Sequence, residues 1–249
     1  MNFFRIFGRD EVAAGGLPAG AIRSAALTHV GHVRAVNEDR VLDLPDAGLW
    51  AVADGMGGHQ SGDVAAQIAV DALAELAGSG RALDGEDILA ALQSANTRIY
   101  ERYAAAERPS GTTIVAALHV EGGIEIFWAG DSRAYRLRAG IWHCLTRDHS
   151  VVQQMVDAGA LTPSAAARHP KGNVITRALG VDRDVTIDRV ATDFAAGDTI
   201  MLCSDGVSRS LAPDMPRTPP VAALAQSLLD QALARDGSDN ASLVLIAAG

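Results

Sequence analysis

The sequence has 249 residues, of which 48% are hydrophobic and 20% charged, and its formal net charge is −9. This composition supplies enough apolar material for a substantial core. The acidic balance argues against a general nucleic-acid-binding protein, which needs a basic face to meet phosphates. It leaves phosphorylated substrates open, because bound cations can reverse the field of an acidic cleft.

The predicted elements begin after a leader. Residues 1–20, rich in Ala and Gly, predict a flexible N-terminal leader, and residues 21–249 predict a single domain because no linker interrupts them. Short apolar runs then predict strands at residues 21–29, 40–44 and 48–53. Two helices are expected next, because apolar residues recur at helical spacing after Ser61 or Asp63 and again after residues 84–87.

The second half of the chain predicts further strands. Apolar runs separated by Glu-Gly-Gly, Gly-Asp-Ser and Arg-Ala-Gly turns indicate an antiparallel meander, with strands at residues 112–120, 124–129, 133–138 and 141–145. The remaining expected elements are a short helix at 150–158, strands at 184–190 and 199–203, a helix at 221–234 and a strand at 241–247. This order lacks regular βαβ alternation, so it favours an α+β layered sandwich.

Aspartates stand where four of these apolar runs end. They are Asp54, Asp131, Asp205 and Asp239, and glycine follows Asp54 and Asp205. Carboxylates held by strand ends can face a shared cleft, and a glycine lets a backbone carbonyl approach a ligand. Such hard oxygen donors suit Mg²⁺ or Mn²⁺. The alternative is that each Asp-Gly pair is an ordinary turn; the recurrence favours a metal site, and spacing alone leaves both open.

A second polar segment lies upstream. Arg34 offers a planar guanidinium that matches phosphate oxygens, and Glu38 and Asp39 add carboxylates. Taken alone, these residues equally suit a surface arginine beside a solvated acidic turn.

Read in order, the motifs of this chain resemble those of the metal-dependent serine/threonine phosphatases of the PPM or type 2C family, in its bacterial form. They span residues 30–246 in the family's order. The matching segments are Arg34-Ala-Val-Asn-Glu-Asp39, Val52-Ala-Asp-Gly-Met-Gly-Gly-His59, Ser110-Gly-Thr-Thr113, Gly130-Asp-Ser-Arg-Ala-Tyr-Arg136, Leu145-Thr-Arg-Asp-His-Ser150, Val174-Ile-Thr-Arg-Ala-Leu-Gly180, Leu202-Cys-Ser-Asp-Gly206 and Asp239-Asn240. The resemblance implies a four-layer αββα sandwich of two antiparallel sheets flanked by helices.

The resemblance also implies roles for individual residues. Asp54 would bridge two Mn²⁺ or Mg²⁺ ions, with the Gly55 carbonyl on one of them and Asp205 and Asp239 as further ligands. Glu38 would bind directly or through water. Asp131 would hold a third ion together with Asp205, so two to three ions are expected. Arg34 would bind the phosphate, and residues 148–180 would form a mobile flap beside the active site.

The activity implied is direct hydrolysis of phosphoserine and phosphothreonine in proteins by a metal-activated water, without a phosphoenzyme. Some relatives carry a histidine two residues after the bridging aspartate as general acid, but Met56 stands there in this chain. The proton donor stays open between a metal-bound water and His59. Residues 207–220 depart most from the family pattern.

Two other functions stay open at this point. One is a catalytically silent phosphoprotein-binding or sensing module on the same fold, which loss of a ligand aspartate would mark; all are present. The other is a hydrolase of small phosphate esters. The expected partners are phosphorylated proteins, among them a bacterial eukaryotic-like Ser/Thr kinase and its targets, with no nucleic acid and with a monomer by default.

The location and redox state follow from composition. No run approaches the roughly 18–20 uninterrupted apolar residues of a membrane span, so we expect a cytoplasmic protein. Cys144 and Cys203 both lie in apolar runs, and we expect both to be reduced and buried rather than paired or metal-binding.

Overall fold

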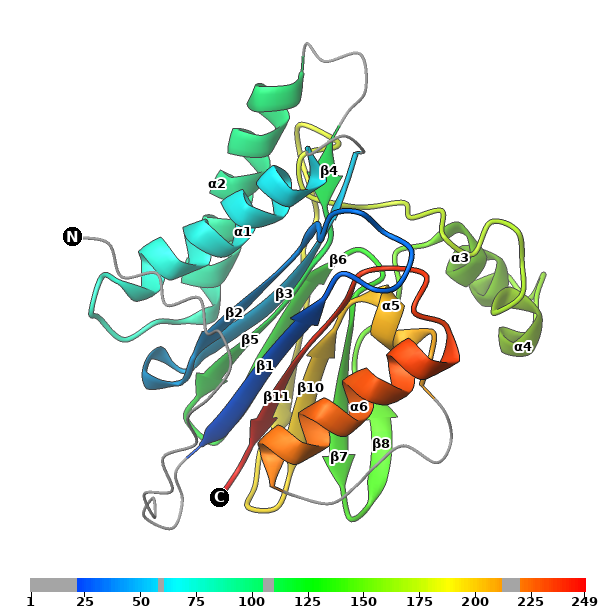
Figure 1. Ribbon diagram of the computed structural model, residues 1–249. Helices are drawn as coiled ribbons and strands as arrows, with labels where there is room; N and C mark the ends of the chain where they lie inside the picture. The colour runs from blue at the N-terminus through cyan, green and yellow to red at the C-terminus, as the bar shows by residue number, and fades with distance from the viewer. Residues whose placement is uncertain (1–21, 58–60, 105–109, 212–219) are drawn as a thin grey trace.

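The computed structural model describes residues 22–57, 61–104, 110–211 and 220–249 (Figure 1). The leader predicted at residues 1–20 and the candidate proton donor His59 lie outside the described residues. The strands of the described part form two sheets, and every strand pair that joins neighbours within them is antiparallel.

The first sheet has five strands and the second has six. The five-stranded sheet has the order β1 (Arg23–His29), β11 (Ala241–Ala247), β10 (Thr199–Cys203), β7 (Arg133–Arg138), β8 (Ile141–Cys144). The six-stranded sheet has the order β2 (Asp39–Leu44), β3 (Leu49–Met56), β5 (Ile114–Val120), β6 (Gly123–Ala129), β9 (Asp188–Asp193), and the short β4 (Gly111–Thr112) pairs with β3. Some strands that follow each other in the sequence, such as β1 and β2 or β6 and β7, therefore lie in different sheets.

Helices cover the outer faces of both sheets (Figure 1). On the six-stranded sheet lie α1 (Gly62–Ala77) and α2 (Gly85–Tyr103), and on the five-stranded sheet lies α6 (Val221–Arg235). The short elements are the 3-10 turn η1 (Pro45–Ala47) and the helices α3 (Val151–Asp157), α4 (Pro163–Ala166) and α5 (Asp205–Ser208). The α3–α4 segment projects beside the sandwich in Figure 1.

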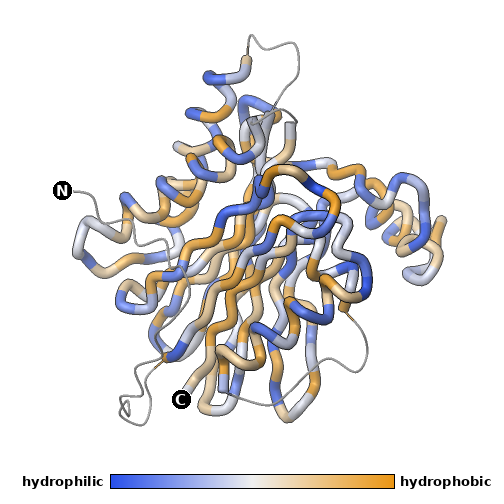
Figure 2. The backbone as a smooth tube through the Cα atoms, viewed as in Figure 1, coloured by the Kyte–Doolittle hydropathy of each residue, from blue (hydrophilic) through white to orange (hydrophobic). Residues whose placement is uncertain are grey.

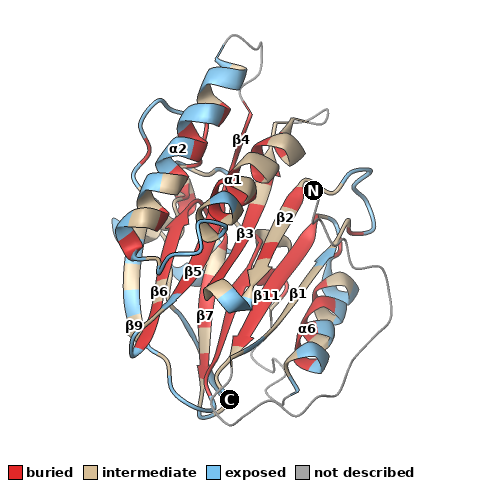
Figure 3. Ribbon diagram, turned by 90° about the vertical axis from the view of Figure 1, so that its left-hand side faces the viewer, coloured by how far each residue is buried: buried red, intermediate tan, exposed pale blue. Residues whose placement is uncertain are grey.

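The buried apolar residues form three clusters, one in each space between adjacent layers of a four-layer sandwich. One cluster lies between α1, α2 and the six-stranded sheet, one between the two sheets, and one between α6 and the five-stranded sheet. Trp50 and Ile200, both fully buried, belong to the cluster between the sheets. Figure 2 shows hydrophobic residues along the central strands, and Figure 3 shows these strands buried. The predicted αββα sandwich is confirmed, because the central strands of both sheets are buried on both faces.

One predicted connection is wrong. The strands expected as one meander over residues 112–145 form two hairpins: β5–β6 in one sheet and β7–β8 in the other. The chain crosses between the sheets at Gly130, whose φ of 124° is a conformation that a side chain disfavours. A Cβ at Gly130 would also lie 2.4 Å from Thr113 Cβ. The alternation of apolar and polar residues along two successive strands is the same whether they pair in one sheet or lie in different sheets. The sequence pattern therefore cannot reveal this crossing.

The segment before β9 also differs from prediction. The strand expected at residues 184–190 runs instead from Asp188 to Asp193. Residues 182–185 contact α2, where the Val185 carbonyl accepts a hydrogen bond of 2.7 Å from Gln93 Nε2. Tertiary contacts with α2 thus hold this apolar stretch out of the sheet.

The sequence pattern missed two short helices, α4 and α5, each of four residues. A second correction concerns Cys144. Cys203 is buried and free as predicted, whereas Cys144 is free but exposed. The reason is its place on β8, the edge strand of the five-stranded sheet, where one face of the hairpin stays open to solvent. None of the helices within the described ranges has the length and apolar character of a membrane span.

Candidate metal and phosphate site

The candidate residues gather where strand ends from both sheets meet, at the upper end of the sandwich in Figure 1. Asp54 lies near the end of β3, and Asp131 lies in the crossing between β6 and β7. Asp205 begins α5 directly after β10, and Asp239 precedes β11. The burial of the strands behind these residues holds their carboxylates at one rim.

Asp54 is the centre of the carboxylate cluster. Burial raises its pKa well above the usual value, and the negative charges of Asp39, Asp205, Asp131 and Asp239 raise it further. Asp39 stands opposite Asp54 in the β2–β3 register. The structure thus brings the other three acidic turns and Asp39 close enough to Asp54 for their charges to affect its pKa.

Asp39 is a buried carboxyl with one unused oxygen. Its Oδ2 accepts a hydrogen bond of 2.9 Å from Ser204 Oγ, whereas its Oδ1 is buried and has no hydrogen-bond partner. Burial raises the pKa of Asp39 to about 7, partly offset by hydrogen bonds from Ser242 and Ser204. An unpartnered buried oxygen is costly unless a further donor or cation satisfies it.

Gly55 brings the Glu38 backbone against β3. The Gly55 amide donates a hydrogen bond of 3.3 Å to the Glu38 carbonyl. A Cβ at Gly55 would lie 2.2 Å from the Gly62 carbonyl oxygen and 2.7 Å from the Glu38 carbonyl oxygen. The position therefore requires glycine, because β3, the start of α1 and the segment before β2 approach each other too closely for a side chain.

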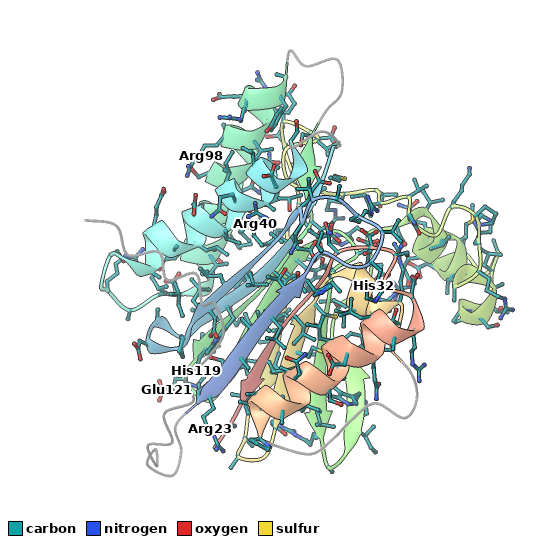
Figure 4. All side chains as sticks on the ribbon, in the orientation of Figure 1. Arg23, His32, Arg40, Arg98, His119 and Glu121 are labelled. Atoms are coloured by element: carbon teal, nitrogen blue, oxygen red, sulfur yellow. The ribbon has the colours of Figure 1, made fainter. Side chains whose placement is uncertain are left out.

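Arg34 and Asp239 form an ion pair at the rim of the site. Arg34 Nη2 lies 2.8 Å from Asp239 Oδ2, and about half of the Arg34 side chain is exposed. Figure 4 places His32 in the same loop, beside the end of α6, where the His32 amide donates a 2.7 Å hydrogen bond to the Gly237 carbonyl. The loop that carries Arg34 is thus anchored next to the loop that carries Asp239.

Asn240 holds that loop in shape. Its Nδ2 donates hydrogen bonds of 2.9 Å to the Val30 carbonyl and 3.0 Å to the Val36 carbonyl, and its Oδ1 accepts one of 2.9 Å from the Glu38 amide. One buried side chain therefore fixes both ends of the Arg34 loop and the position of Glu38.

Asp205 and Asp131 share a second arginine. Arg209 Nη2 lies 2.5 Å from Asp205 Oδ2 and 3.5 Å from Asp131 Oδ2. Burial raises the pKa of Asp131 to about 7, and the charge of Asp205 adds to this while Arg209 opposes it. Burial also raises the pKa of Asp205.

His149 supports the crossing that carries Asp131. The Gly130 amide donates a 3.1 Å hydrogen bond to His149 Nδ1, and the His149 amide donates one of 2.9 Å to the Gly130 carbonyl. The His149 ring stacks on Trp128 with an interplanar angle of 10°. Residues at the base of the predicted flap therefore position the Asp131 turn.

A cavity of about 670 Å³ opens beside the cluster, between the α3–α4 segment and the strand ends. Asp131, Asp205 and Arg209 line it on the side of the cluster, and Val152 and Val156 of α3 line it on the other. A ligand held at the aspartates would thus contact the predicted flap, residues 148–180.

The donor chemistry of the cluster fits divalent cations. All the converging side chains are carboxylates, the donors that Mg²⁺ and Mn²⁺ prefer. Burial raises the pKa of Asp39, Asp54, Asp131 and Asp205, and neighbouring negative charges raise it further. Among the described residues, no three His, Cys, Asp or Glu side chains form a ready-made metal-binding group. Asp239 and Asp205 instead hold Arg34 and Arg209, which occupy oxygens that a cation would use.

Sequence reasoning missed the contributions of Arg209, Asn240, Ser204 and His149. Ser204, Asn240 and His149 stand inside the motifs that match the family, but nothing in the pattern distinguishes a positioning side chain from an ordinary one. Arg209 follows Asp205 by four residues, a spacing that predicts an ion pair on one helical turn. Its reach to Asp131 depends on the crossing at Gly130, which the pattern does not show.

Comparisons with known proteins agree with this geometry. The family model described as "Protein phosphatase 2C" matches residues 29–241. The "Serine/threonine protein phosphatase PstP" of Mycobacterium tuberculosis is 37% identical over 235 residues, which are 90% of this chain and 44% of that protein. The chain thus spans less than half the length of that relative.

Two further matches cover more of the other chain. The "Serine/threonine phosphatase stp" of Listeria innocua is 37% identical over 191 residues, which are 73% of this chain and 76% of that protein. The crystal structure of the catalytic domain of PstP, described as in complex with two manganese ions, superposes with a TM-score of 0.80 at 35% identity and covers 91% of this chain and 98% of that one. The chain belongs to the protein phosphatase 2C family.

Proposed function

We propose that this protein is a metal-dependent phosphoprotein phosphatase that hydrolyses phosphoserine and phosphothreonine in proteins. The observation that carries the proposal is the convergence of Asp39, Asp131, Asp205 and Asp239 on Asp54, at the meeting point of the two sheets. Family membership supports the same activity. A cluster of like charges without enough cationic partners suits a site that binds divalent cations.

The ligands of the proposed site come from both sheets. Asp54, the Gly55 carbonyl, Asp205 and Asp239 would hold two ions, with Glu38 acting directly or through water. Asp131 would share a third ion with Asp205. When bound, Mn²⁺ or Mg²⁺ supplies Lewis-acid chemistry that lowers the pKa of water and neutralises charge on a phosphoryl group.

The side chains of this chain then bind and orient the substrate. Arg34 is half-exposed at the rim, so its guanidinium can turn from Asp239 toward phosphoryl oxygens and present two donors to them. Asn240 keeps the Arg34 loop in place for this contact. Met56 carries no acidic proton, so that position does not protonate the departing oxygen. Catalysis in this site is mainly positioning and electrostatic stabilisation.

The expected substrates are phosphorylated proteins, among them a bacterial eukaryotic-like Ser/Thr kinase and its targets. The cavity beside the α3–α4 segment supports a protein substrate, because residues flanking the phosphorylated one have room there. We further propose a cytoplasmic monomer whose phosphatase domain comprises residues 21–249, with residues 1–20 as a leader and residues 148–180 as a flap.

A phosphothreonine peptide tests the activity. With Mn²⁺ the protein should release phosphate, and EDTA should abolish the release. Asp205→Asn should reduce the rate by more than about 100-fold, beyond the loss typical of removing an outer partner of a metal ligand. Asp46→Asn, in the exposed η1 turn, is the matched control and should keep the full rate. Equal rates with Mn²⁺, with EDTA and in Asp205→Asn would contradict the proposal, and tight peptide binding without turnover would indicate the silent module.

A further inference from the structure

Arg209 stands between two buried or half-buried carboxylates, Asp131 and Asp205, and among the described residues it is the arginine that forms an ion pair with both. A single nitrogen, Nη2, lies 2.5 Å from Asp205 Oδ2 and 3.5 Å from Asp131 Oδ2. Asp131 is 6% exposed, so little solvent reaches its charge. The guanidinium is therefore the cation that this part of the cluster holds in the structure.

The backbone sets the position of Arg209 independently of that contact. The Arg209 amide donates a 2.9 Å hydrogen bond to the Asp205 carbonyl and ends the single turn of α5. The side chains of residues four apart on a helical turn lie on the same face. Asp131 reaches the same point from the Gly130 crossing, which His149 supports. Two separate segments, the α5 turn and the Gly130 crossing, thus meet at one nitrogen.

The neighbouring arginine cannot take this role. Arg133 also lines the cavity, but its Nε and Nη2 donate hydrogen bonds of 2.8 Å and 2.7 Å to the two oxygens of Asp148. Arg34 binds Asp239 instead. Arg209 is therefore the cationic partner of the Asp131–Asp205 pair among the described residues.

We propose that Arg209 is a tethered cation that competes with a divalent ion for the position between Asp131 and Asp205, and so weakens the binding of that ion. The inference rests on the proposed function, which assigns a third ion to this pair of carboxylates. A guanidinium bound to the same oxygens both blocks them and repels a second positive charge nearby. Because it is attached to the chain, its local concentration stays high.

The site allows exchange between the two cations. About a third of the Arg209 side chain is exposed, and it borders the 670 Å³ cavity together with Asp131 and Asp205. An ion entering from the cavity can displace the guanidinium, which has room to swing into the same space. Occupancy of the third position then depends on the concentration of the divalent ion, in competition with Arg209.

Binding of Mn²⁺ to EDTA-stripped full-length protein tests the inference, with the free ion measured by its electron paramagnetic resonance signal. Wild type should bind two ions tightly and a third weakly. Arg209→Gln should keep the tight pair and bind the third ion at least about tenfold more tightly, because it removes the competing charge and keeps a side chain of similar length. Arg209→Met should show the same gain, and serves if the glutamine variant is unstable.

Two control variants complete the experiment. Arg209→Gln combined with Asp131→Asn should lose the gained ion, because the gain requires the Asp131 carboxylate. Arg98→Gln, on α2 and away from the strand ends in Figure 4, should match wild type. If both Arg209 variants bind the third ion with an affinity within twofold of that of wild type, the inference is overturned. Absence of any Mn²⁺ binding by wild type would instead overturn the proposed function.

Discussion

At the scale of single residues, the site is a concentration of negative charge that the fold tolerates. Asp54 lies among four other aspartates, and burial removes the water that would separate their charges. Arg34 and Arg209 each neutralise part of the cluster, and Ser204 donates to Asp39. These contacts leave Asp39 Oδ1 without a partner. The metal-free protein therefore holds unfavourable electrostatic energy in this cluster.

That energy predicts a pH dependence of stability. Burial raises the pKa of Asp39 and Asp131 from 3.8 to about 7, so the folded protein retains their protons where the unfolded chain has lost them. The contribution of these two carboxyls to the stability of the folded state is therefore complete below pH 3.8, and it is lost as the pH rises through about 7. Each fully titrating group changes the free energy of unfolding by at most about 1.4 kcal/mol per pH unit.

Thermal unfolding of EDTA-treated protein measures this effect. The Tm should fall as the pH rises from about 5 to 7.5. The ion-paired Asp193 and Asp198 have lowered pKa values, so they titrate below this pH range. Asp39→Asn should flatten the slope, because it removes one of the buried carboxyls whose pKa is raised. A Tm that rises over this window in both proteins would contradict the raised pKa values.

At the scale of elements, the segment after the predicted flap is attached to α2 through one buried side chain. Asn96 Oδ1 accepts a 2.7 Å hydrogen bond from the Gly180 amide. Its Nδ2 donates to the carbonyls of Asp182 and Arg183 at 3.2 Å and 2.9 Å. The helix itself begins with a reciprocal capping box between Asp84 and Asp87. A well-defined helix therefore provides a rigid anchor for the chain returning from the α3–α4 segment.

Asn96→Ala tests this anchor. The substitution leaves the Gly180 amide and two carbonyls without their partner inside the protein, so the free energy of unfolding should fall by about 2–4 kcal/mol. Urea unfolding measures the loss. Ser94→Ala, exposed on the same helix, should change stability by less than about 0.5 kcal/mol. Similar values for the two variants would show that the anchor contributes nothing to stability.

At the scale of the whole molecule, the proposed metal ligands join the two sheets at one end. Asp54 and Gly55 belong to β3 of the six-stranded sheet, whereas Asp205 and Asp239 flank β10 and β11 of the five-stranded sheet. The apolar layer between the sheets holds them face to face along their length. A cation at the rim would add a link between them and relieve the charge of the cluster.

Bound Mn²⁺ should therefore raise the Tm of the protein. A free ion concentration 100 times the Kd stabilises the folded state by about 2.7 kcal/mol, which corresponds to about 5–10 °C for a chain of this size. Differential scanning calorimetry with and without Mn²⁺ measures the shift. Asp54→Asn should remove most of it, and Asp46→Asn should retain it. An equal shift in wild type and Asp54→Asn would place the ion elsewhere.

The sequence by itself determined the layered α+β class, most of the strand and helix positions, and the four acidic turns. Hydrophobic periodicity and turn residues are local properties, so they can be read from neighbouring positions. The helix starting near Asp84, the strand Arg133–Arg138 and the strand Ala241–Ala247 all follow such local patterns. The order of the motifs also identified the family, and with it the expected roles of Asp54, Asp205 and Asp239.

Only the tertiary structure decided how these pieces meet. The crossing at Gly130 separates the β5–β6 and β7–β8 hairpins into different sheets and brings Asp131 to Asp205. The exposure of Cys144 and the contact of Arg209 with Asp131 likewise depend on how distant segments pack. Asn96 binds Asp182 and Arg183, which lie 86 and 87 residues further along the chain. Strand pairing between distant segments leaves no local pattern, because either sheet satisfies the same periodicity.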